Sequence, residues 1–245
     1  EVSVNPRSKS IFGKNTIYYK VLDESNKMQI DLQSPMQLTK ATQSGKSLSI
    51  SRKENVYYIH LQEKSKKNNI NNITVYFEGV PKEAVKAPWD GGFSWNKDVN
   101  GQDFIATSCQ GIGASVWWPN KDHMYDEVDS MQISINVPKP LKAISNGRLK
   151  EISESKNGTS YTWFVSNPIN NYGVNINIGN YVNFSEKYQG EKGILDMDYY
   201  VLKHNLEKAK KQFLDAPKMM KAFEYWFGPY PFYEDSYKLV EVPYL

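Results

Sequence analysis

The sequence predicts a mainly β fold with a short helical segment near its carboxyl end. Tyrosine, threonine, valine and isoleucine recur in short runs over most of the 245 residues, and these residue types favour strands. Polar turn clusters separate the runs at the spacing typical of a sandwich or a curved open sheet. Helical periodicity begins only near Leu202. We therefore expect an amino-terminal β domain over residues 1–202 and a second segment over residues 203–245.

The first part of the β region contains runs that are apolar or alternate between apolar and polar residues. They lie at residues 17–22, 28–32, 48–51, 56–61 and 72–79. Each has the length and composition of a single strand. Between residues 88 and 129 the pattern breaks into segments rich in glycine and tryptophan, so this part is predicted to be mostly loop.

Strand patterns return after residue 129. Residues 130–137 place Met131, Ile133, Ile135 and Val137 on one face by alternation, and this face is predicted to be buried. Residues 149–152 and 161–165 flank an Asn157-Gly158 pair. Because Asn-Gly tolerates the positive φ angles of a tight turn, the three segments predict a β-hairpin.

Two helices and a final strand are predicted near the carboxyl end. Leu206, Ala209 and Phe213 follow helical spacing, and Asp215 with Pro217 has the pattern of an N-cap and first turn. The second helix carries an apolar stripe and is predicted to end at Gly228, which two prolines follow. An apolar run over residues 237–242 then predicts a strand. The stripe contains Met219, Met220, Phe223, Trp226 and Phe227.

Composition and charge exclude several classes of function. Thirty basic and 27 acidic residues give a net charge of +3 without a basic stripe, which gives nucleic-acid binding no support. No run approaches the roughly 20 apolar residues of a membrane-spanning helix. One cysteine excludes a disulfide within the chain. The chain begins at Glu1 without an initiator methionine, which suggests a processed or trimmed start. We expect a secreted or periplasmic location in preference to a cytoplasmic one.

Two motifs carry a family resemblance. Residues 227–231 read Phe-Gly-Pro-Tyr-Pro, and residues 238–243 read Lys-Leu-Val-Glu-Val-Pro. Upstream, Ser108, Cys109 and Gln110 precede a Trp-Trp-Pro sequence at residues 117–119. In this order and separation, the motifs resemble the aminopeptidase N and leukotriene-hydrolase family of zinc peptidases over essentially the whole chain.

The resemblance implies a saddle-like amino-terminal β domain joined to the start of a thermolysin-like catalytic domain. A Gly-x-Met-Glu loop and a His-Glu-x-x-His helix would follow Leu245. The parent protein would use zinc to remove amino-terminal residues from peptides. The 245 residues would form its non-catalytic front, inactive alone and without a cofactor, and the missing catalytic domain would be their partner.

The resemblance also implies a role for Gln110, which matches a Gln or Glu that accepts a hydrogen bond from the substrate's α-ammonium. A charge-assisted hydrogen bond contributes roughly 1.5–3 kcal/mol, so its loss would cost on the order of 10- to 150-fold in binding or turnover. From the residues alone, a strand amide that bonds its neighbours is the preferred interpretation of Gln110.

No catalytic residue and no metal ligand is assigned in this chain. His60, His123 and His204 are the only histidines, and none begins a His-Glu-x-x-His pattern. Cys109 lies beside Gln110 but has no histidine near it in sequence, so a small buried side chain is the preferred interpretation. The Gly111 and Gly113 pair lacks the third glycine and the strand-to-helix context of a dinucleotide motif.

A different class of function stays open. A non-catalytic β-sandwich module that binds glycan or protein through aromatic surfaces would explain the strand pattern without a missing domain, with Trp89 and Trp117 as candidate platforms. A further expectation concerns self-association. If the chain ends before its catalytic core, a surface that includes Phe223, Trp226, Phe227, Leu239, Val240 and Val242 loses its packing partner.

Overall fold

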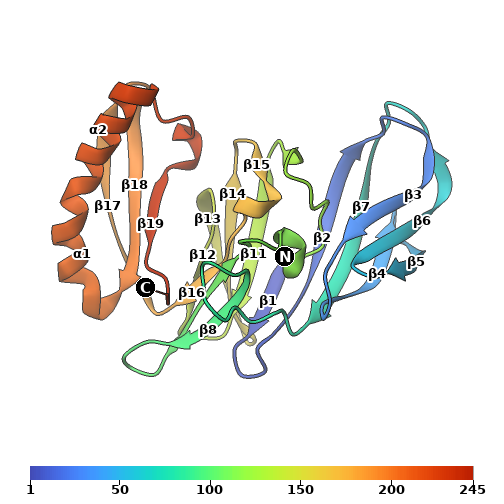
Figure 1. Cartoon of the computed structure of the whole chain (residues 1–245), viewed down its shortest axis with the longest axis horizontal. Coiled ribbons are helices and arrows are strands. Elements are labelled where there is room, and N and C mark those ends of the chain that lie inside the picture. Colours follow the sequence, from blue (N-terminus) through green and yellow to red (C-terminus); the bar gives the residue numbers. More distant parts are fainter. Residues whose placement is uncertain (245) are drawn as a thin grey trace. The chain divides into compact units, whose positions relative to one another are not determined.

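The computed structural model describes residues 1–244, apart from the side chain of Glu63, and most of its regular structure is strand (Figure 1). The helices α1 (Leu206–Gln212) and α2 (Ala216–Phe227) lie near the carboxyl end. This arrangement confirms the predicted mainly β class. The chain forms two compact units, one of residues 1–95, 107–127 and 170–174, the other of residues 96–106, 128–169 and 175–245. The junction near Leu202 stays a prediction.

The first unit is built on seven strands that pair antiparallel in the order β1-β2-β7-β4-β5-β6-β3. In Figure 1, β2 and β7 run side by side along most of their length. The sequence runs predicted as strands at residues 28–32, 48–51, 56–61 and 72–79 each fall on one of these elements. The strands are β1 (Val2–Asn5), β2 (Ser10–Lys20), β3 (Ser25–Asp31), β4 (Gln37–Gln43), β5 (Lys46–Lys53), β6 (Val56–Ser65) and β7 (Ile70–Gly79).

Alternation along β7 builds part of the first unit's core. Ile73, Val75 and Phe77 are buried, whereas the residues between them are partly exposed. This is the pattern of a strand with one face covered. Each buried aliphatic side chain of this kind contributes roughly 1.5–3 kcal/mol relative to an exposed one.

The second unit contains the predicted hairpin. Strands β13 (Arg148–Ser155) and β14 (Gly158–Val165) pair antiparallel, and β14 also pairs with β11 (Met131–Val137). The two turn residues are Lys156 and Asn157, because Ser155 pairs directly with Gly158. The alternating face of β11 is buried as predicted at Ile133, Ile135 and Val137.

A glycine turn leads into β13. Gly147 has a φ of +74°, and a Cβ built on it would lie 2.0 Å from the carbonyl oxygen of Phe164. Only glycine combines this left-handed conformation with so close an approach to another backbone segment. The carbonyl of Gly147 also accepts a hydrogen bond from the Lys238 ammonium, so the turn is tied to the final strand.

Two smaller sheets complete the second unit. Strands β12 (Lys142–Ile144), β16 (Asn177–Gly179) and β9 (Asp103–Ser108) pair in that order. Strands β17 (Tyr181–Gly190) and β18 (Gly193–Leu202) form an antiparallel hairpin, and β19 (Tyr237–Val240) pairs with β18 in parallel. The remaining elements are β8 (Gly92–Lys97), β10 (Glu127–Val128), β15 (Ile169–Asn170), and the 3-10 turns η1 (Ala114–Val116), η2 (Asn171–Gly173), η3 (Lys203–Asn205), η4 (Phe213–Asp215) and η5 (Tyr233–Asp235).

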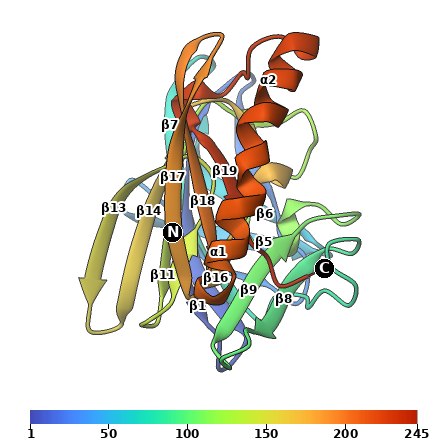
Figure 2. The ribbon, with the colours of Figure 1, turned by 90° about the vertical axis from the view of Figure 1, so that its left-hand side faces the viewer.

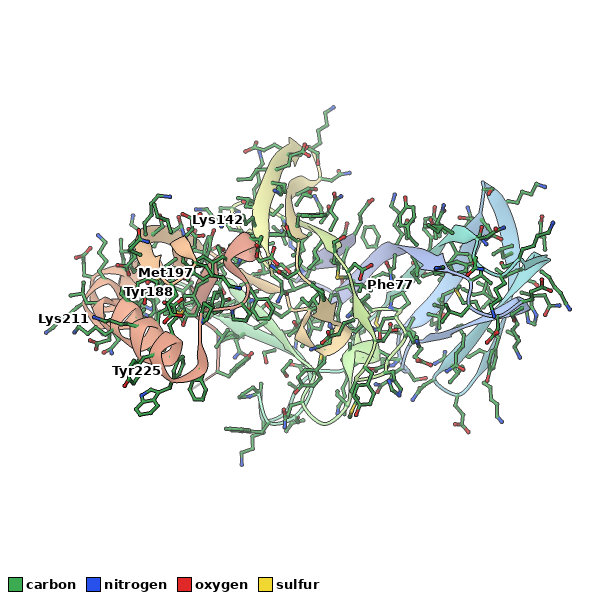
Figure 3. The ribbon with its side chains drawn as sticks, turned by 90° about the horizontal axis from the view of Figure 1, so that it is seen from above. Phe77, Lys142, Tyr188, Met197, Lys211 and Tyr225 are labelled. Carbon is green, nitrogen blue, oxygen red and sulfur yellow. The ribbon has the colours of Figure 1, made fainter. Side chains whose placement is uncertain are left out.

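Helices α1 and α2 lie along the sheet of β17, β18 and β19, as the two side views show together (Figures 1 and 2). Met197 and Tyr199 of β18 pack with Met220 of α2 in one buried cluster. Figure 3 labels Met197 in this layer, and Tyr225 on the outer side of the helix. Asp215 stands at the predicted N-cap of α2, but its carboxylate instead accepts a hydrogen bond from Lys218, because η4 leads into the helix with helical backbone angles.

The buried face of α2 contains a carboxylate. Glu224 is only 4% exposed and accepts hydrogen bonds from the hydroxyls of Tyr188 (2.9 Å) and Tyr233 (2.6 Å). The backbone N–H groups of Glu191 and Tyr230 donate to it as well, each at 3.2 Å. Burial opposes ionisation of Glu224, but these donors outweigh burial and hold the pKa of the carboxyl below its ordinary value. Glu224 therefore fastens α2 to the β17–β18 turn and to the segment after the helix.

Part of the surface of α2 is apolar and uncovered in the part of the chain that the structure describes. Phe223, Trp226 and Phe227 are 52%, 74% and 83% exposed. The predicted stripe is thus divided, since Met220 is buried against the sheet whereas these aromatic side chains are exposed. No described helix is both long and apolar enough to cross a membrane.

Candidate functional site

Gln110, the predicted substrate-binding residue, lies in a tight turn of the first unit, directly after β9. The carbonyl of Cys109 accepts hydrogen bonds from the backbone N–H groups of Ile112 (3.1 Å) and Gly113 (3.0 Å). Gly111 and Gly113 have φ angles of +74° and +81°, which glycine adopts without strain. The turn leaves the Gln110 side chain exposed.

Neighbouring loops hold this turn in place. Ile112 packs so closely on Gly91 that a Cβ at position 91 would lie 2.2 Å from its Cγ1 atom. The Gln33 amide donates to the carbonyl of Ile112 at 2.5 Å and to the hydroxyl of Ser115 at 3.0 Å. The turn is therefore supported from two other segments of the same unit.

Asp122 fixes the segment that follows the turn. Its carboxylate accepts hydrogen bonds from the backbone N–H groups of Ala114 (3.3 Å) and Ser115 (2.9 Å) and from the Ser115 hydroxyl (2.5 Å). A Cβ at Gly113 would lie 2.3 Å from the same carboxylate. The acidic side chain thus closes the 3-10 turn η1.

Tyr172 meets Gln110 at the surface. Its hydroxyl donates a hydrogen bond of 2.7 Å to Oε1 of Gln110. The turn η2 that carries Tyr172 is anchored on both sides, because Asn170 accepts from the N–H of Gly173 and buried Asn171 donates to the carbonyl of Lys121. Sixty-two positions separate Tyr172 from Gln110, and nothing in the sequence pattern predicts their contact.

Cys109 has the environment of an unreactive thiol. It is buried, and burial raises its pKa to about 11, with the carboxylate of Asp122 acting in the same direction. The thiol is therefore protonated at neutral pH, in agreement with the preferred interpretation of a small buried side chain.

The described residues do not fit a catalytic zinc ion. They contain no group of three or more His, Cys, Asp or Glu side chains that could hold a metal. His60 pairs with Ser51 at 3.0 Å, and His123 accepts from the backbone N–H of Tyr125.

The two tryptophans considered as binding platforms differ in exposure. Trp117 is 3% exposed and packs edge-on against Phe93, with ring centroids 6.1 Å apart. Trp89 is 66% exposed. Packing therefore accounts for Trp117, and only Trp89 offers a face to a ligand.

The fold has clear counterparts among solved structures. An M1 zinc metallopeptidase from Deinococcus radiodurans matches 99% of this chain and 54% of its own, with a TM-score of 0.78 and 15% identity. A mutant of that enzyme bound to a Tyr-Ser-Ala substrate matches equally well, at a TM-score of 0.78. Yeast LTA4 hydrolase matches 98% of this chain and 36% of its own, with a TM-score of 0.76 and 17% identity.

These likenesses establish the fold. The chain spans about half the length of the Deinococcus enzyme. No protein-family model and no curated protein matches the chain in sequence.

Proposed function

We propose that this chain is the amino-terminal, non-catalytic part of a zinc-dependent aminopeptidase. The observation that carries the proposal is the match of nearly the whole chain to about half of a zinc metallopeptidase. The motifs at residues 108–110, 227–231 and 238–243 support it independently, since they are features of the amino-acid sequence and do not depend on the likeness of the folds. The zinc and the general base belong to the polypeptide beyond residue 245, and the chain alone is inactive. We place the parent in a secreted or periplasmic compartment.

The sequence of the gene beyond Leu245 tests this proposal. We expect a Gly-x-Met-Glu loop, then a His-Glu-x-x-His helix and a downstream glutamate, which together bind zinc and activate water. A continuation that lacks these groups, or a stop codon, would remove the enzyme proposal and favour a binding module.

Within this proposal Gln110 anchors the substrate's α-ammonium. Its exposed carboxamide and the rigid turn beneath it suit that role. In the complete protein, Gln110→Ala is expected to lower kcat/KM for a peptide such as Tyr-Ser-Ala by roughly 10- to 150-fold, the value of one charge-assisted hydrogen bond. Steady-state kinetics would measure this. Asn100→Ala, at an exposed position elsewhere in the chain, is the control. Equal kinetics of the two variants would count against the anchor.

We also propose that the exposed aromatic face of α2 makes this 245-residue chain self-associate. Phe223, Trp226 and Phe227 form an apolar surface of the kind that soluble proteins rarely leave open. Sedimentation is expected to show a concentration-dependent dimer, weakened by Trp226→Glu and unaffected by Lys211→Glu at an exposed position of α1. A strict monomer at high concentration would contradict this expectation.

A further inference from the structure

We propose that Tyr172 is a second acceptor for the substrate's α-ammonium, and that it forms one cradle with Gln110. This inference rests on the proposed function, because it deepens the role given to Gln110. It is carried by the 2.7 Å hydrogen bond from the Tyr172 hydroxyl to Oε1 of Gln110 and by the exposure of both side chains.

The hydrogen bond leaves accepting capacity on both oxygens. The phenol donates its single proton to Gln110, so the lone pairs of its oxygen can still accept, and the carbonyl oxygen of Gln110 keeps a second lone pair. A primary ammonium has three N–H donors. It can therefore donate one hydrogen bond to each of two oxygens that lie 2.7 Å apart.

The same bond also orients the carboxamide of Gln110. A carboxamide has an accepting oxygen and a donating NH₂ group, and only the oxygen can receive a hydrogen bond from an ammonium. Because the phenol donates to Oε1, it fixes the oxygen on the side that faces Tyr172. Loss of the hydroxyl would remove one acceptor and free the amide of the other to rotate.

The turn η2, which carries Tyr172, is held in place by hydrogen bonds at both of its neighbouring asparagines. Asn170 caps η2, and the 2.7 Å bond from Asn171 to Lys121 ties η2 to the loop that follows the Gln110 turn. Both oxygens are neutral acceptors, so the cradle suits a single positive charge with several N–H donors. The chemical class that fits is the unblocked primary amine of a peptide, because an acetylated amino terminus lacks the charge and keeps only one N–H donor.

The test uses the complete protein and the tripeptide Tyr-Ser-Ala. Tyr172→Phe keeps the ring and removes only the hydroxyl. It is expected to raise KM about 10-fold while kcat changes less than about twofold, because one hydrogen bond to a charged group is lost in binding. Tyr18→Phe, at an exposed tyrosine of the same unit, is the matched control and should change neither constant. Inhibition by N-acetyl-Tyr-Ser-Ala should be the same in the wild type and in Tyr172→Phe.

The double variant separates the possible failures. If the two side chains form one cradle, Tyr172→Phe should still raise KM in the Gln110→Ala variant, because its hydroxyl is itself an acceptor, but by less than it does in the wild type, because no carboxamide is left to orient. Fully additive losses, or a Tyr172→Phe variant that behaves as the Tyr18→Phe control does, would overturn the cradle while leaving Gln110 as the anchor. Absence of peptide hydrolysis by the wild-type protein would overturn the proposed function, and the cradle with it.

Discussion

Glu224→Ala is expected to lower the free energy of unfolding by about 4 kcal/mol, because four donors lose a buried charged acceptor together. Two of these donors are tyrosine hydroxyls, and two are backbone N–H groups in separate loops. With alanine at this position, all four lose the acceptor that they share. Urea unfolding of the 245-residue chain, followed by circular dichroism at pH 7, measures the difference.

Glu224→Gln provides the matched control for shape. The carboxamide keeps one acceptor and brings an NH₂ group toward existing donors, so a smaller loss of about 2 kcal/mol is expected. A Glu224→Ala variant as stable as the wild type would show that the four hydrogen bonds contribute nothing in net terms.

The same residue gives stability a pH dependence with a definite sign. The pKa of Glu224 is lower in the folded chain than its ordinary value of 4.5. Its stabilisation is therefore complete above pH 4.5 and is lost as the pH falls through the folded-state pKa. The wild type should lose more stability than Glu224→Gln between neutral pH and this acidic range.

Gly147→Ala is expected to cost at least about 4 kcal/mol or to prevent folding, because the new methyl group meets a backbone that cannot move aside. The built Cβ lies 2.0 Å from the Phe164 carbonyl oxygen and 2.7 Å from the nitrogen of Val165. Relief would require β13 and β14 to separate at the start of their pairing. Thermal unfolding followed by circular dichroism would report the loss.

Gly101→Ala isolates the contribution of the clash. Gly101 lies in the same unit with nearly the same φ, +76°, but nothing lies within 4 Å of a Cβ built there. Only the strain of the left-handed conformation remains, at about 1 kcal/mol. If Gly147→Ala and Gly101→Ala lose the same stability, the whole effect comes from backbone conformation and the clash contributes nothing.

Local patterns in the sequence are enough to predict about half of the strands that the structure describes and both helices. Alternation in β7 and β11 reports which face is covered, because side chains along a strand point to opposite sides. Leu206 and Ala209 are three positions apart, which reflects the period of a helix. Gly228 follows the last residue of α2 and marks the end of that helix. Such signals lie within a few residues of each other, so they need no knowledge of the tertiary fold.

Features that depend on distant contacts cannot be predicted in this way. Glu224 is a charged residue on an apolar helix, and its burial follows only from Tyr188 and Tyr233, which approach it from outside α2. A motif indicates the position of Gln110, but no pattern indicates its partner Tyr172. Asp122 is followed in the sequence by other acidic residues, which do not set it apart. Only the fold shows that its carboxylate closes η1.

The parallel pairing of β19 with β18 has a consequence for the order of folding. The hairpin of β17 and β18 joins residues that are neighbours along the chain, so it can close within microseconds. Strand β19 reaches β18 only after the chain has passed through both helices, because a parallel partner requires a long crossover. Loop-closure entropy delays this contact. The last strand should therefore join a nucleus already formed by the hairpin and the helices, and the chain that carries Lys238 and its bond to Gly147 is among the last parts of the unit to become ordered.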